Sequence, residues 1–292
     1  MPDTKESSSV LRSLIAGSTA GAIEISITYP FEFAKTRSQL NRRLEPGQKL
    51  AWPKFGPEWY AGCTTSIVGN SVKAGVRFLA FDAFKSVLAD EDGKISGPKT
   101  VLAGLGAGVT ESLLAVTPFE SIKTQIIDDR KSANPRMKGF VHATGIIARE
   151  KGVRGFLQGF IPTTARQAAN SAVRFGSYNS LKQLAQGYVA PGEKLGGFAT
   201  FGLGAAAGLI TVYCTQPLDS VKTRMQSIDA RGQYRNTLHC AARIFKEEGL
   251  LVFWSGSVPR LGRLMISGGL VFTFYEQAME LFKRIDPEGK YI

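Results

Sequence analysis

Basic side chains recur at helical spacing inside segments that are otherwise apolar or made of small residues. Lys73 and Arg77 are four residues apart, so they share one helix face and lie about 6 Å apart along its axis. Arg166 and Arg174 are eight residues apart, which is about 80° around a helix and ~12 Å along it. Guanidinium groups bind carboxylates and phosphates in a bidentate manner. The pattern therefore indicates a binding site for a small polyanion rather than a catalytic centre.

Arg260 and Arg263 bring the number of such cations to six, and we expect no acid on the same helix faces. Charged residues at membrane depth mark functional sites by default. Long basic side chains also reach toward lipid headgroups from helix ends. This second interpretation stays open for Arg260, which is near the start of an expected helix, but it suits the deeper cations poorly.

Other functional classes lack support in the sequence. The net charge of +12 favours anionic partners in general, including nucleic acid. A soluble basic nucleic-acid binder, however, does not account for 24 successive uncharged residues at 195–218. No hydrolase triad, phosphate-binding loop or cluster of metal ligands is present, so we expect neither an enzyme, nor a metal, nor a cofactor. Cys63, Cys214 and Cys240 are odd in number and scattered, which predicts no disulfide framework.

One eight-residue pattern occurs three times: a proline, an acid two residues later and a lysine five residues later. The copies read PFEFAKTR, PFESIKTQ and PLDSVKTR, and they begin at Pro30, Pro118 and Pro217. Glycines follow at 62, 159 and 256, separated by 97 residues each time. Such self-similarity predicts three copies of one structural unit. Because proline disrupts a helix, we expect each helix to bend at this motif.

Each unit is expected to contain two helices. The first helices cover 11–31, 101–119 and 195–218, and the last of these is long enough to cross ~30 Å of hydrocarbon. The second helices cover roughly 64–88, 161–185 and 258–283 and are amphipathic. Small residues four apart in the first helices are typical of packed membrane helices. We predict an all-α membrane protein with six transmembrane helices in three tandem repeats, at 10–89, 98–186 and 194–284; a soluble helical repeat protein is the alternative.

The loops differ in charge according to their place in the repeat. The three long loops inside the repeats (38–58, 128–157 and 226–256) carry 15 Lys and Arg residues, whereas each short loop between repeats carries one, Lys94 or Lys194. The positive-inside rule therefore places the long loops on the side equivalent to the cytoplasm, and both termini on the other side. Two stretches in the long loops, 139–152 and 237–249, read as amphipathic surface helices.

The triplicated motif resembles the signature of the mitochondrial carrier family over residues 10 to 284. The resemblance implies threefold pseudosymmetry around a central cavity and alternating access. It implies localisation in the mitochondrial inner membrane, with the long loops in the matrix. It also implies a matrix gate in which each acid pairs with the lysine of the next repeat, and a glutamine that braces one pair. The predicted pairs are Glu32–Lys123, Glu120–Lys222 and Asp219–Lys35, with Gln125 as the brace. Pairing within each helix is the alternative, since acid and lysine three apart share a face.

A weaker second gate is expected at the other end of the second helices, on the cytoplasmic side. The corresponding segments read FDAFK, YNSLK and YEQAM, so only one of three cyclic pairs is complete, Lys182–Glu276. Lys85 faces an asparagine, and Asp82 faces a methionine. Exposed pairs contribute little, roughly 0–1 kcal/mol each. We therefore expect this cytoplasmic gate to open more readily than the matrix gate.

Residues that differ between the repeats are the candidates for solute recognition. Within the family, the segments around the six cations resemble those of carriers of tricarboxylates. That resemblance implies exchange of citrate or isocitrate for malate or another citrate; a dicarboxylate or oxoglutarate carrier is the alternative. The expected solute contacts are Asn70, Lys73, Arg77, Arg166, Gln167, Arg174, Arg260 and Arg263, joined by Lys35 and Lys222 when the matrix gate is open.

Two further expectations concern acids and lipid. Aligned on the motif prolines, Glu24 corresponds to Ser112 and Thr211. Glu24 and Glu111 therefore break the symmetry, either as hydrogen-bonding groups in helix packing or as groups that take up a proton. The family resemblance also implies cardiolipin as a bound lipid, near the glycines at 62, 159 and 256. We expect no obligate protein partner and no nucleic acid.

Overall fold

The computed structural model describes residues 3–40, 52–89, 97–132, 134–187 and 197–285, and these contain helices but no strand. Six long helical rods account for most of them. The first rod of each repeat is α1 (Asp3–Leu40), then α3 (Gly97–Glu111) continued by η2 (Ser112–Val116) and α4 (Thr117–Asp129), then α8 (Gly197–Met225). The second rods are α2 (Cys63–Leu88), α7 (Phe160–Gln186) and α11 (Ser257–Ile285). The six predicted helices are thus confirmed.

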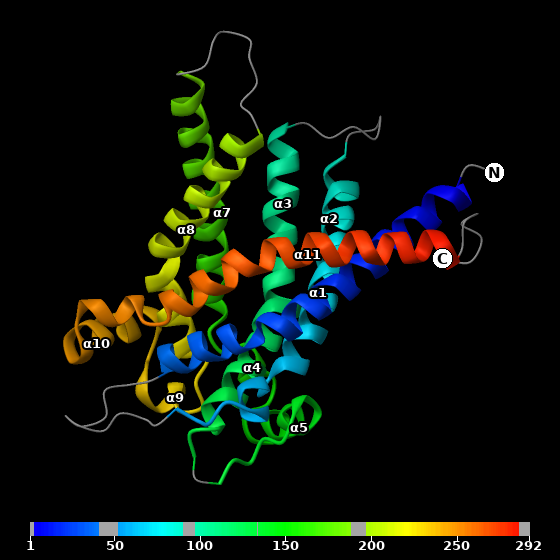
Figure 1. Cartoon of the computed structure of the whole chain (residues 1–292). Coiled ribbons are helices and arrows are strands. Elements are labelled where there is room, and N and C mark those ends of the chain that lie inside the picture. The colour runs from blue at the N-terminus through cyan, green and yellow to red at the C-terminus, as the bar shows by residue number, and fades with distance from the viewer. Residues whose placement is uncertain (1–2, 41–51, 90–96, 133, 188–196, 286–292) are drawn as a thin grey trace.

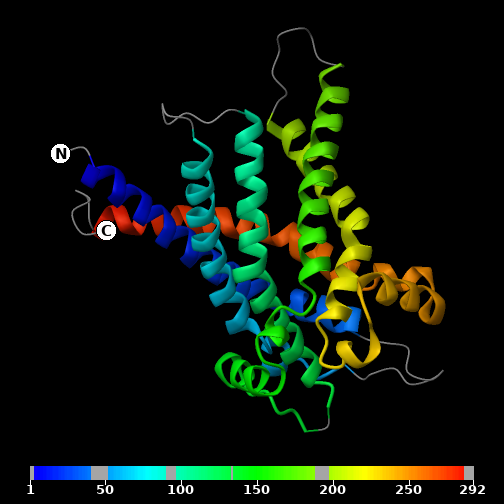
Figure 2. The ribbon, with the colours of Figure 1, turned by 180° about the vertical axis from the view of Figure 1, so that it is seen from behind.

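The rods pack in a closed order around a central space. α1 packs against α2, α2 against α3 and α4, and η2 against α7. α7 then packs against α8, α8 against α11, and α11 along α1. Figures 1 and 2 show α2, α3, α7 and α8 standing roughly upright, while α1 and α11 run obliquely across them side by side. The beginning of α1 and the end of α11 lie at the same edge of the molecule.

Short helices close the end of the molecule where the motifs lie. They are η1 (Pro57–Tyr60), α5 (Phe140–Lys151), α6 (Val153–Phe156), α9 (Ala230–Gln233), α10 (Thr237–Glu248) and η3 (Leu250–Trp254). The surface helices expected at 139–152 and 237–249 are therefore present as α5 and α10. The first long loop falls largely on 41–51, outside the described residues.

The apolar surface of the rods is turned outward. Phe78, Leu105, Phe175, Phe201 and Met265 expose 60 to 82% of their surface. An exterior of this kind suits hydrocarbon, and helices satisfy their backbone groups internally there. Among the residues that the structure describes, two segments are long and apolar enough to cross a membrane by length and hydropathy alone, Leu102–Asp129 and Ala199–Met225. The other rods carry more charge because they present basic or acidic side chains to the interior.

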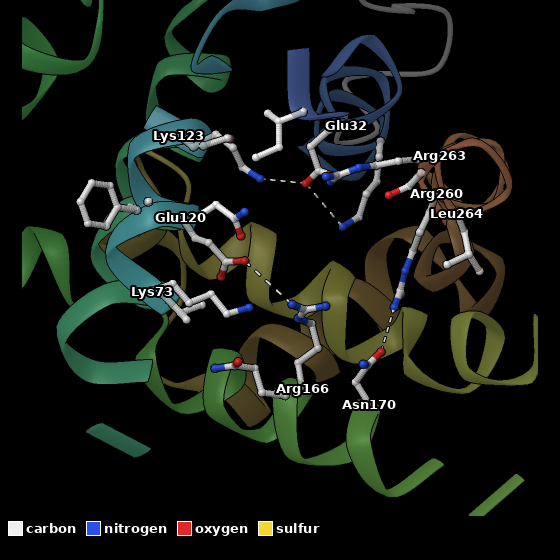
Figure 3. A pocket seen from close by; sticks show the side chains of 18 of the residues that line it. Glu32, Lys73, Glu120, Lys123, Arg166, Asn170, Arg260, Arg263 and Leu264 are labelled. Atoms are coloured by element: carbon white, nitrogen blue, oxygen red, sulfur yellow. Dashed lines mark hydrogen bonds and ion pairs between the residues drawn. The ribbon is translucent and has the colours of Figure 1, made fainter. Parts of the chain in front are cut away.

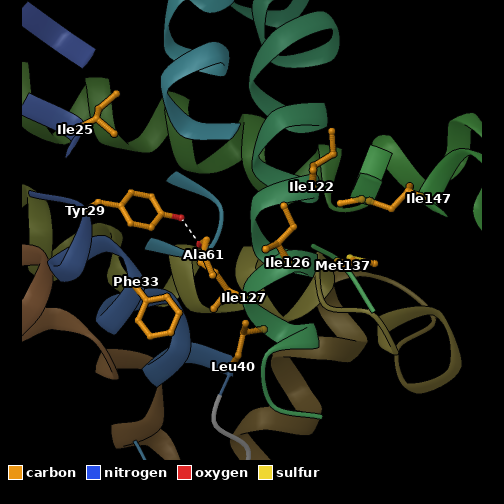
Figure 4. Packing of buried hydrophobic residues seen from close by; sticks show 11 residues of the cluster. Ile25, Tyr29, Phe33, Leu40, Ala61, Ile122, Ile126, Ile127, Met137 and Ile147 are labelled. Atoms are coloured by element: carbon orange, nitrogen blue, oxygen red, sulfur yellow. Dashed lines mark hydrogen bonds between the residues drawn. The ribbon is translucent and has the colours of Figure 1, made fainter. Parts of the chain in front are cut away.

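The tightest packing lies at the motif end. One buried cluster joins α1 to α4 and α5 through Phe33, Ile126 and Ile147, and the Tyr29 hydroxyl donates a 2.6 Å hydrogen bond to the Ala61 carbonyl (Figure 4). A second cluster joins α8 to α10 through Cys240 and neighbouring apolar residues. These two buried clusters therefore pack the helices together around the motif residues.

The 97-residue glycines allow this close packing. Gly62, Gly159 and Gly256 begin α2, α7 and α11 with φ of 86°, 77° and 81°, a region that side chains strongly disfavour. A Cβ on Gly256 would lie 2.9 Å from the Lys35 carbonyl oxygen, and one on Gly62 would lie 3.1 Å from Lys123 Cγ. The glycines thus let each second helix start directly beside a motif lysine of a neighbouring repeat.

The first rods differ at the motif. α1 and α8 continue as α-helix through Pro30 and Pro217, whereas a π-helical turn precedes Pro118. The bends expected at the three prolines stay a prediction. The π-helical turn was not expected, because aligning the repeats on their motif prolines alone hides one inserted residue before the proline.

Candidate functional site

A ring of six alternating charges joins the three repeats at the motif end. Lys123 Nζ lies 2.7 Å from Glu32 Oε1, Lys35 Nζ lies 2.6 Å from Asp219 Oδ2, and Lys222 Nζ lies 2.5 Å from Glu120 Oε2. These are the three predicted inter-repeat pairs. The pair within one helix, Lys35–Glu32, is longer at 3.9 Å. Converging helices bring each acid nearer to the next repeat than to its own lysine, which decides between the two arrangements.

The ring is largely removed from water. Asp219 is fully buried, and Lys222 and Lys35 expose 5% and 8% of their surface. In such surroundings, losing one partner of a pair costs about 3–5 kcal/mol, because the other charge is left buried and uncompensated. The three pairs therefore hold the repeats together at this end.

A glutamine braces one pair, but it is not the predicted one. Gln39 Nε2 donates a 3.0 Å hydrogen bond to Asp219 Oδ2, and the Thr223 hydroxyl donates to Gln39 Oε1 at 2.8 Å. Gln39 follows Lys35 by four residues, so both side chains are on the same face of α1. Extending the motif alignment by four residues beyond its lysine would have found this position.

Gln125 was predicted to brace a pair, and this prediction is wrong for this structure. Its amide donates to the Ser121 hydroxyl at 2.9 Å, and its oxygen accepts from Lys151 at 2.9 Å. Gln125 follows Lys123 by two residues, about 200° around the helix, so it points away from the ring. Lys151, in surface helix α5, also donates to the Ile228 carbonyl at 2.9 Å, and burial lowers its pKa.

Beyond the ring lies a cavity of about 420 Å³. Its size is in the range of small-molecule sites. Figure 3 shows side chains from α1, α2, α4, α7 and α11 converging on it. Predicted solute contacts on its wall are Lys35, Asn70, Lys73, Arg166, Gln167, Arg174, Arg260 and Arg263. Asn170 and Ser267, which were not predicted as contacts, also line it.

Two predicted contacts are not on the cavity wall. Arg77 exposes 69% of its side chain and lies 3.6 Å from Glu111 Oε2, beyond the lining residues. Lys222 is committed to Glu120 in the ring, which places it below the cavity. The position of Lys222 does not contradict its prediction, because it was expected to join the solute only when the matrix gate is open. For Arg77, depth along the helix axis depends on helix tilt, which the sequence does not specify.

Acids accompany the cavity cations, contrary to the expectation of an acid-free face. Arg263 lies 2.8 Å from Glu32 and 3.5 Å from Glu24. Lys73 lies 3.8 Å from Glu111, and that acid exposes only 1% of its surface. These acids come from neighbouring helices, so reading one helix at a time could not reveal them.

Arg166 connects the cavity to the ring. Its Nε lies 3.3 Å from Asp219 Oδ1, and its Nη2 lies 3.9 Å from Glu120 Oε1. A single guanidinium thus touches the acids of two different ring pairs while its side chain lines the cavity (Figure 3). An anion bound in the cavity would compete with these acids for Arg166.

Arg260 is bound to neighbouring helices rather than directed to lipid. It donates hydrogen bonds to Gln216 Oε1 and Thr215 Oγ1, both at 2.9 Å, and approaches Asn170 Oδ1 at 3.5 Å. Two of these acceptors are on α8 and one is on α7. The headgroup interpretation of Arg260 is therefore wrong, and its guanidinium is part of the cavity wall.

The opposite end of the rods is open. Asp82, Lys85, Lys182 and Glu276 are all exposed, and no ion pair joins any two of these described residues. The Lys182–Glu276 pair expected for the second gate is thus not formed here, because the rods diverge toward that end (Figure 2). The described rods are therefore closed at the ring and open at the opposite end of this cavity.

Comparison with known proteins agrees with this architecture. Residues 6–92, 93–189 and 193–286 each match the family described as mitochondrial carrier protein. The chain is 70% identical to mitochondrial citrate transporter A of Aspergillus niger, covering 99% of this chain and 98% of the relative. It is 50% identical to the tricarboxylate transport protein of Saccharomyces cerevisiae, covering 94% and 97% of the two chains. It is 36% identical to the mitochondrial tricarboxylate transport protein of Rattus norvegicus, covering 94% and 90%. The triplicated motif, the six rods and these matches together show that the chain belongs to the mitochondrial carrier protein family.

Proposed function

We propose that this protein exchanges citrate or isocitrate for malate or a second citrate across the mitochondrial inner membrane. The observation that carries the proposal is the cavity itself, which is lined by basic and amide side chains from several helices. Relatives over nearly the full length are named for citrate or tricarboxylate transport, which supports the same solute class here.

The chemistry of the wall suits a tricarboxylate. Citrate carries close to three negative charges near neutral pH, and Arg166, Arg174 and Arg263 offer planar donor groups that match carboxylates. Asn70 and Gln167 can donate to or accept from a hydroxyl group. Isocitrate bears the same groups in a different arrangement. Malate has one carboxylate fewer and would leave one cation without a solute partner.

Alternating access follows from the asymmetry of the two ends. The charge ring closes the matrix end, and the cytoplasmic end is open, so a solute enters the cavity from the cytoplasmic side. Its carboxylates replace Asp219 and Glu120 as partners of Arg166, so the closed ring loses its contacts with this guanidinium and the closed state loses that stabilisation. The matrix gate then opens while Asp82, Lys85, Lys182 and Glu276 approach one another at the cytoplasmic gate. Lys35 and Lys222, freed from their acids, join the solute contacts.

One observation favours a second candidate, a dicarboxylate or oxoglutarate carrier. Lys73 and Arg174 are the extra cations that favour a tricarboxylate, yet Lys73 and its neighbour Arg77 both lie within 4 Å of Glu111. A carboxylate already paired with these cations lowers the charge available to the solute. This pairing favours a solute with two carboxylates rather than three.

Placement in the membrane is part of the proposal. The basic long loops face the matrix, and both termini face the intermembrane space. Cardiolipin phosphates bind the exposed N–H groups where α2, α7 and α11 begin, directly after the positive-φ glycines. We propose no cofactor and no obligate protein partner for the exchange.

Exchange in liposomes tests the function. Purified protein is reconstituted into vesicles loaded with unlabelled citrate, and uptake of labelled citrate, malate, oxoglutarate and ATP is measured from outside. We expect rapid citrate uptake, slower malate uptake and no ATP uptake. Empty vesicles and protein-free vesicles are the controls. Uptake of oxoglutarate without uptake of citrate would contradict the tricarboxylate assignment and establish the second candidate.

A further inference from the structure

Repeat 2 differs from its sisters by a π-helical turn. This turn, Ser112–Val116, lies between Glu111 and Pro118, whereas α1 and α8 are regular α-helix at the same place. A π-turn holds one residue more than the α-helical turn that it replaces. A residue of α3 therefore lies one residue further from Pro118 than the equivalent residues of α1 and α8 lie from Pro30 and Pro217.

The sequence contains an independent sign of the same displacement. The small-residue pairs Gly17/Gly21 and Gly204/Gly208 lie 13 and 9 residues before their prolines, but Gly104/Gly108 lie 14 and 10 residues before Pro118. The buried alanines agree: Ala20 and Ala207 lie ten residues before their prolines, and Ala107 lies eleven before its own. One extra residue therefore lies between 108 and 118, where the structure has the π-turn.

This displacement changes which residues are equivalent. Glu111, seven residues before Pro118, takes the place that Glu24 and Thr211 occupy six residues before Pro30 and Pro217. The alignment of Glu24 with Ser112 is therefore wrong. Ser112 instead forms a 2.8 Å hydrogen bond with the Thr164 hydroxyl on α7. The three equivalent positions hold two carboxylates and one hydroxyl, and all three are buried.

Each carboxylate at these positions compensates cations on the adjacent second helix. Glu24 lies 3.5 Å from Arg263 Nη2, and Glu111 lies 3.8 Å from Lys73 Nζ and 3.6 Å from Arg77 Nη1. Both acids belong to a first rod and reach a cation on the second rod packed against it. The acids are therefore equivalent in position, whereas their cations are not, since Arg263 is the sister of Gly69 and lies one helical turn from the level of Lys73.

The third position lacks the acid. Thr211 donates its hydroxyl hydrogen to the Ala207 carbonyl of its own helix at 2.6 Å, so it offers no charge to α7. Arg174 on α7 is the sister of Arg77, 97 residues later, and it lines the cavity. In the part of the chain that the structure describes, no carboxylate lies within ion-pair distance of Arg174.

We infer that Glu24 and Glu111 are resident counter-ions that set the charge of the accepted solute, and that the missing third carboxylate at Thr211 leaves Arg174 for an additional solute carboxylate. The inference deepens the proposed function and rests on it. A solute carboxylate must displace Glu24 or Glu111 from their cations, but it binds Arg174 without displacing an acid. Selectivity for a tricarboxylate over a dicarboxylate therefore depends on this third position.

Substitution at the third position tests the inference. Thr211→Glu places a carboxylate near Arg174, and Thr211→Gln has nearly the same size without the charge. The half-saturation concentrations for citrate and malate are measured in liposomes for both variants. For each variant, the half-saturation concentration for citrate is divided by that for malate. We expect this ratio to be on the order of tenfold higher in Thr211→Glu than in Thr211→Gln, because the added carboxylate makes one charge interaction with Arg174 in partly buried surroundings.

Removal of a resident acid should act in the opposite direction. Glu111→Gln leaves Lys73 and Arg77 uncompensated. We therefore expect the half-saturation concentration for citrate to fall several-fold relative to that for malate. A loss of folded protein changes the maximal rates for both solutes alike and cannot produce opposite changes of this ratio. Ratios within twofold of wild type in both Thr211→Glu and Glu111→Gln, or a change toward malate in Glu111→Gln, would overturn the inference.

The register itself has a separate test. In the double variant Glu111→Ser with Ser112→Glu, the carboxylate moves to the residue that faces Thr164, so we expect the same citrate-to-malate ratio as in Glu111→Gln. Recovery of the wild-type ratio would show that position 112, and not 111, is the counterpart of Glu24. Citrate uptake by the wild-type protein tests the proposed function independently of every variant, so failures of the two ideas are distinguishable.

Discussion

Exchange of citrate falls more than 100-fold when Arg166 is replaced by Ala, and nearly as far when it is replaced by Lys. Arg166 contacts Asp219 and Glu120 and lines the cavity, so it serves both the ring and the solute. Breaking a buried charge contact costs about 3–5 kcal/mol, and lysine cannot reproduce the planar fork of donors. The measurement is the initial rate of citrate exchange per amount of reconstituted protein.

A matched control separates this effect from loss of a surface charge. Arg149 on α5 is exposed, and Arg149→Ala and Arg149→Lys should retain at least half of the wild-type rate. The thermal unfolding midpoint of each variant in detergent reports whether it is folded. A folded Arg166→Lys variant with more than a third of the wild-type rate would show that exchange does not require the guanidinium of Arg166.

Reversal of one charge in the ring should abolish exchange, and a second reversal should restore part of it. Lys222→Glu places two carboxylates opposite each other where Lys222 and Glu120 now lie 2.5 Å apart. We expect a rate below one hundredth of wild type, consistent with an uncompensated buried charge. The double variant Lys222→Glu with Glu120→Lys re-forms the pair and should recover the rate at least tenfold over the single variant.

This pair is the best choice for reversal because its members have few other charged partners. Lys222 has Glu120 as its ion-pair partner in the ring, and the nearest additional cation to Glu120 is Arg166 at 3.9 Å. Glu32, by contrast, also contacts Arg263 at 2.8 Å, so a reversed lysine there would face a second cation. Equal rates in the single and double variants would contradict an inter-repeat pair between these two residues.

Triplication made the architecture and the ring predictable from the sequence. Pro30 and its sisters aligned the motifs of the three repeats, and the family resemblance implied the inter-repeat pairs that the structure contains. Most of the cavity wall followed from residues that break the symmetry, such as Arg174 and Arg263. These predictions succeeded because a repeated motif constrains three places at once.

Contacts between helices could not be predicted in the same way. Glu111 meets Lys73, and Gln39 meets Asp219, through packing of elements far apart in the chain. The π-turn before Pro118 adds one residue, so alignment on the proline alone assigned Glu24 the wrong counterpart, although the spacing of Gly104 and Gly108 carries the same shift. The prediction for Gln125 failed for another reason, since its spacing of two residues from Lys123 places it on the opposite face of the helix.

Protection of a cavity thiol from chemical modification tests directly whether citrate occupies this cavity. Ser267→Cys places a single reactive thiol on the cavity wall after Cys63, Cys214 and Cys240 are replaced by Ser, and Ser86→Cys gives an exposed thiol away from the cavity. The rate of modification by a membrane-impermeant thiol reagent is measured in vesicles with and without citrate. We predict that citrate slows modification of the thiol at position 267 and leaves the rate at position 86 unchanged, and that oxoglutarate protects position 267 less than citrate does. Equal rates at position 267 with and without saturating citrate would contradict it.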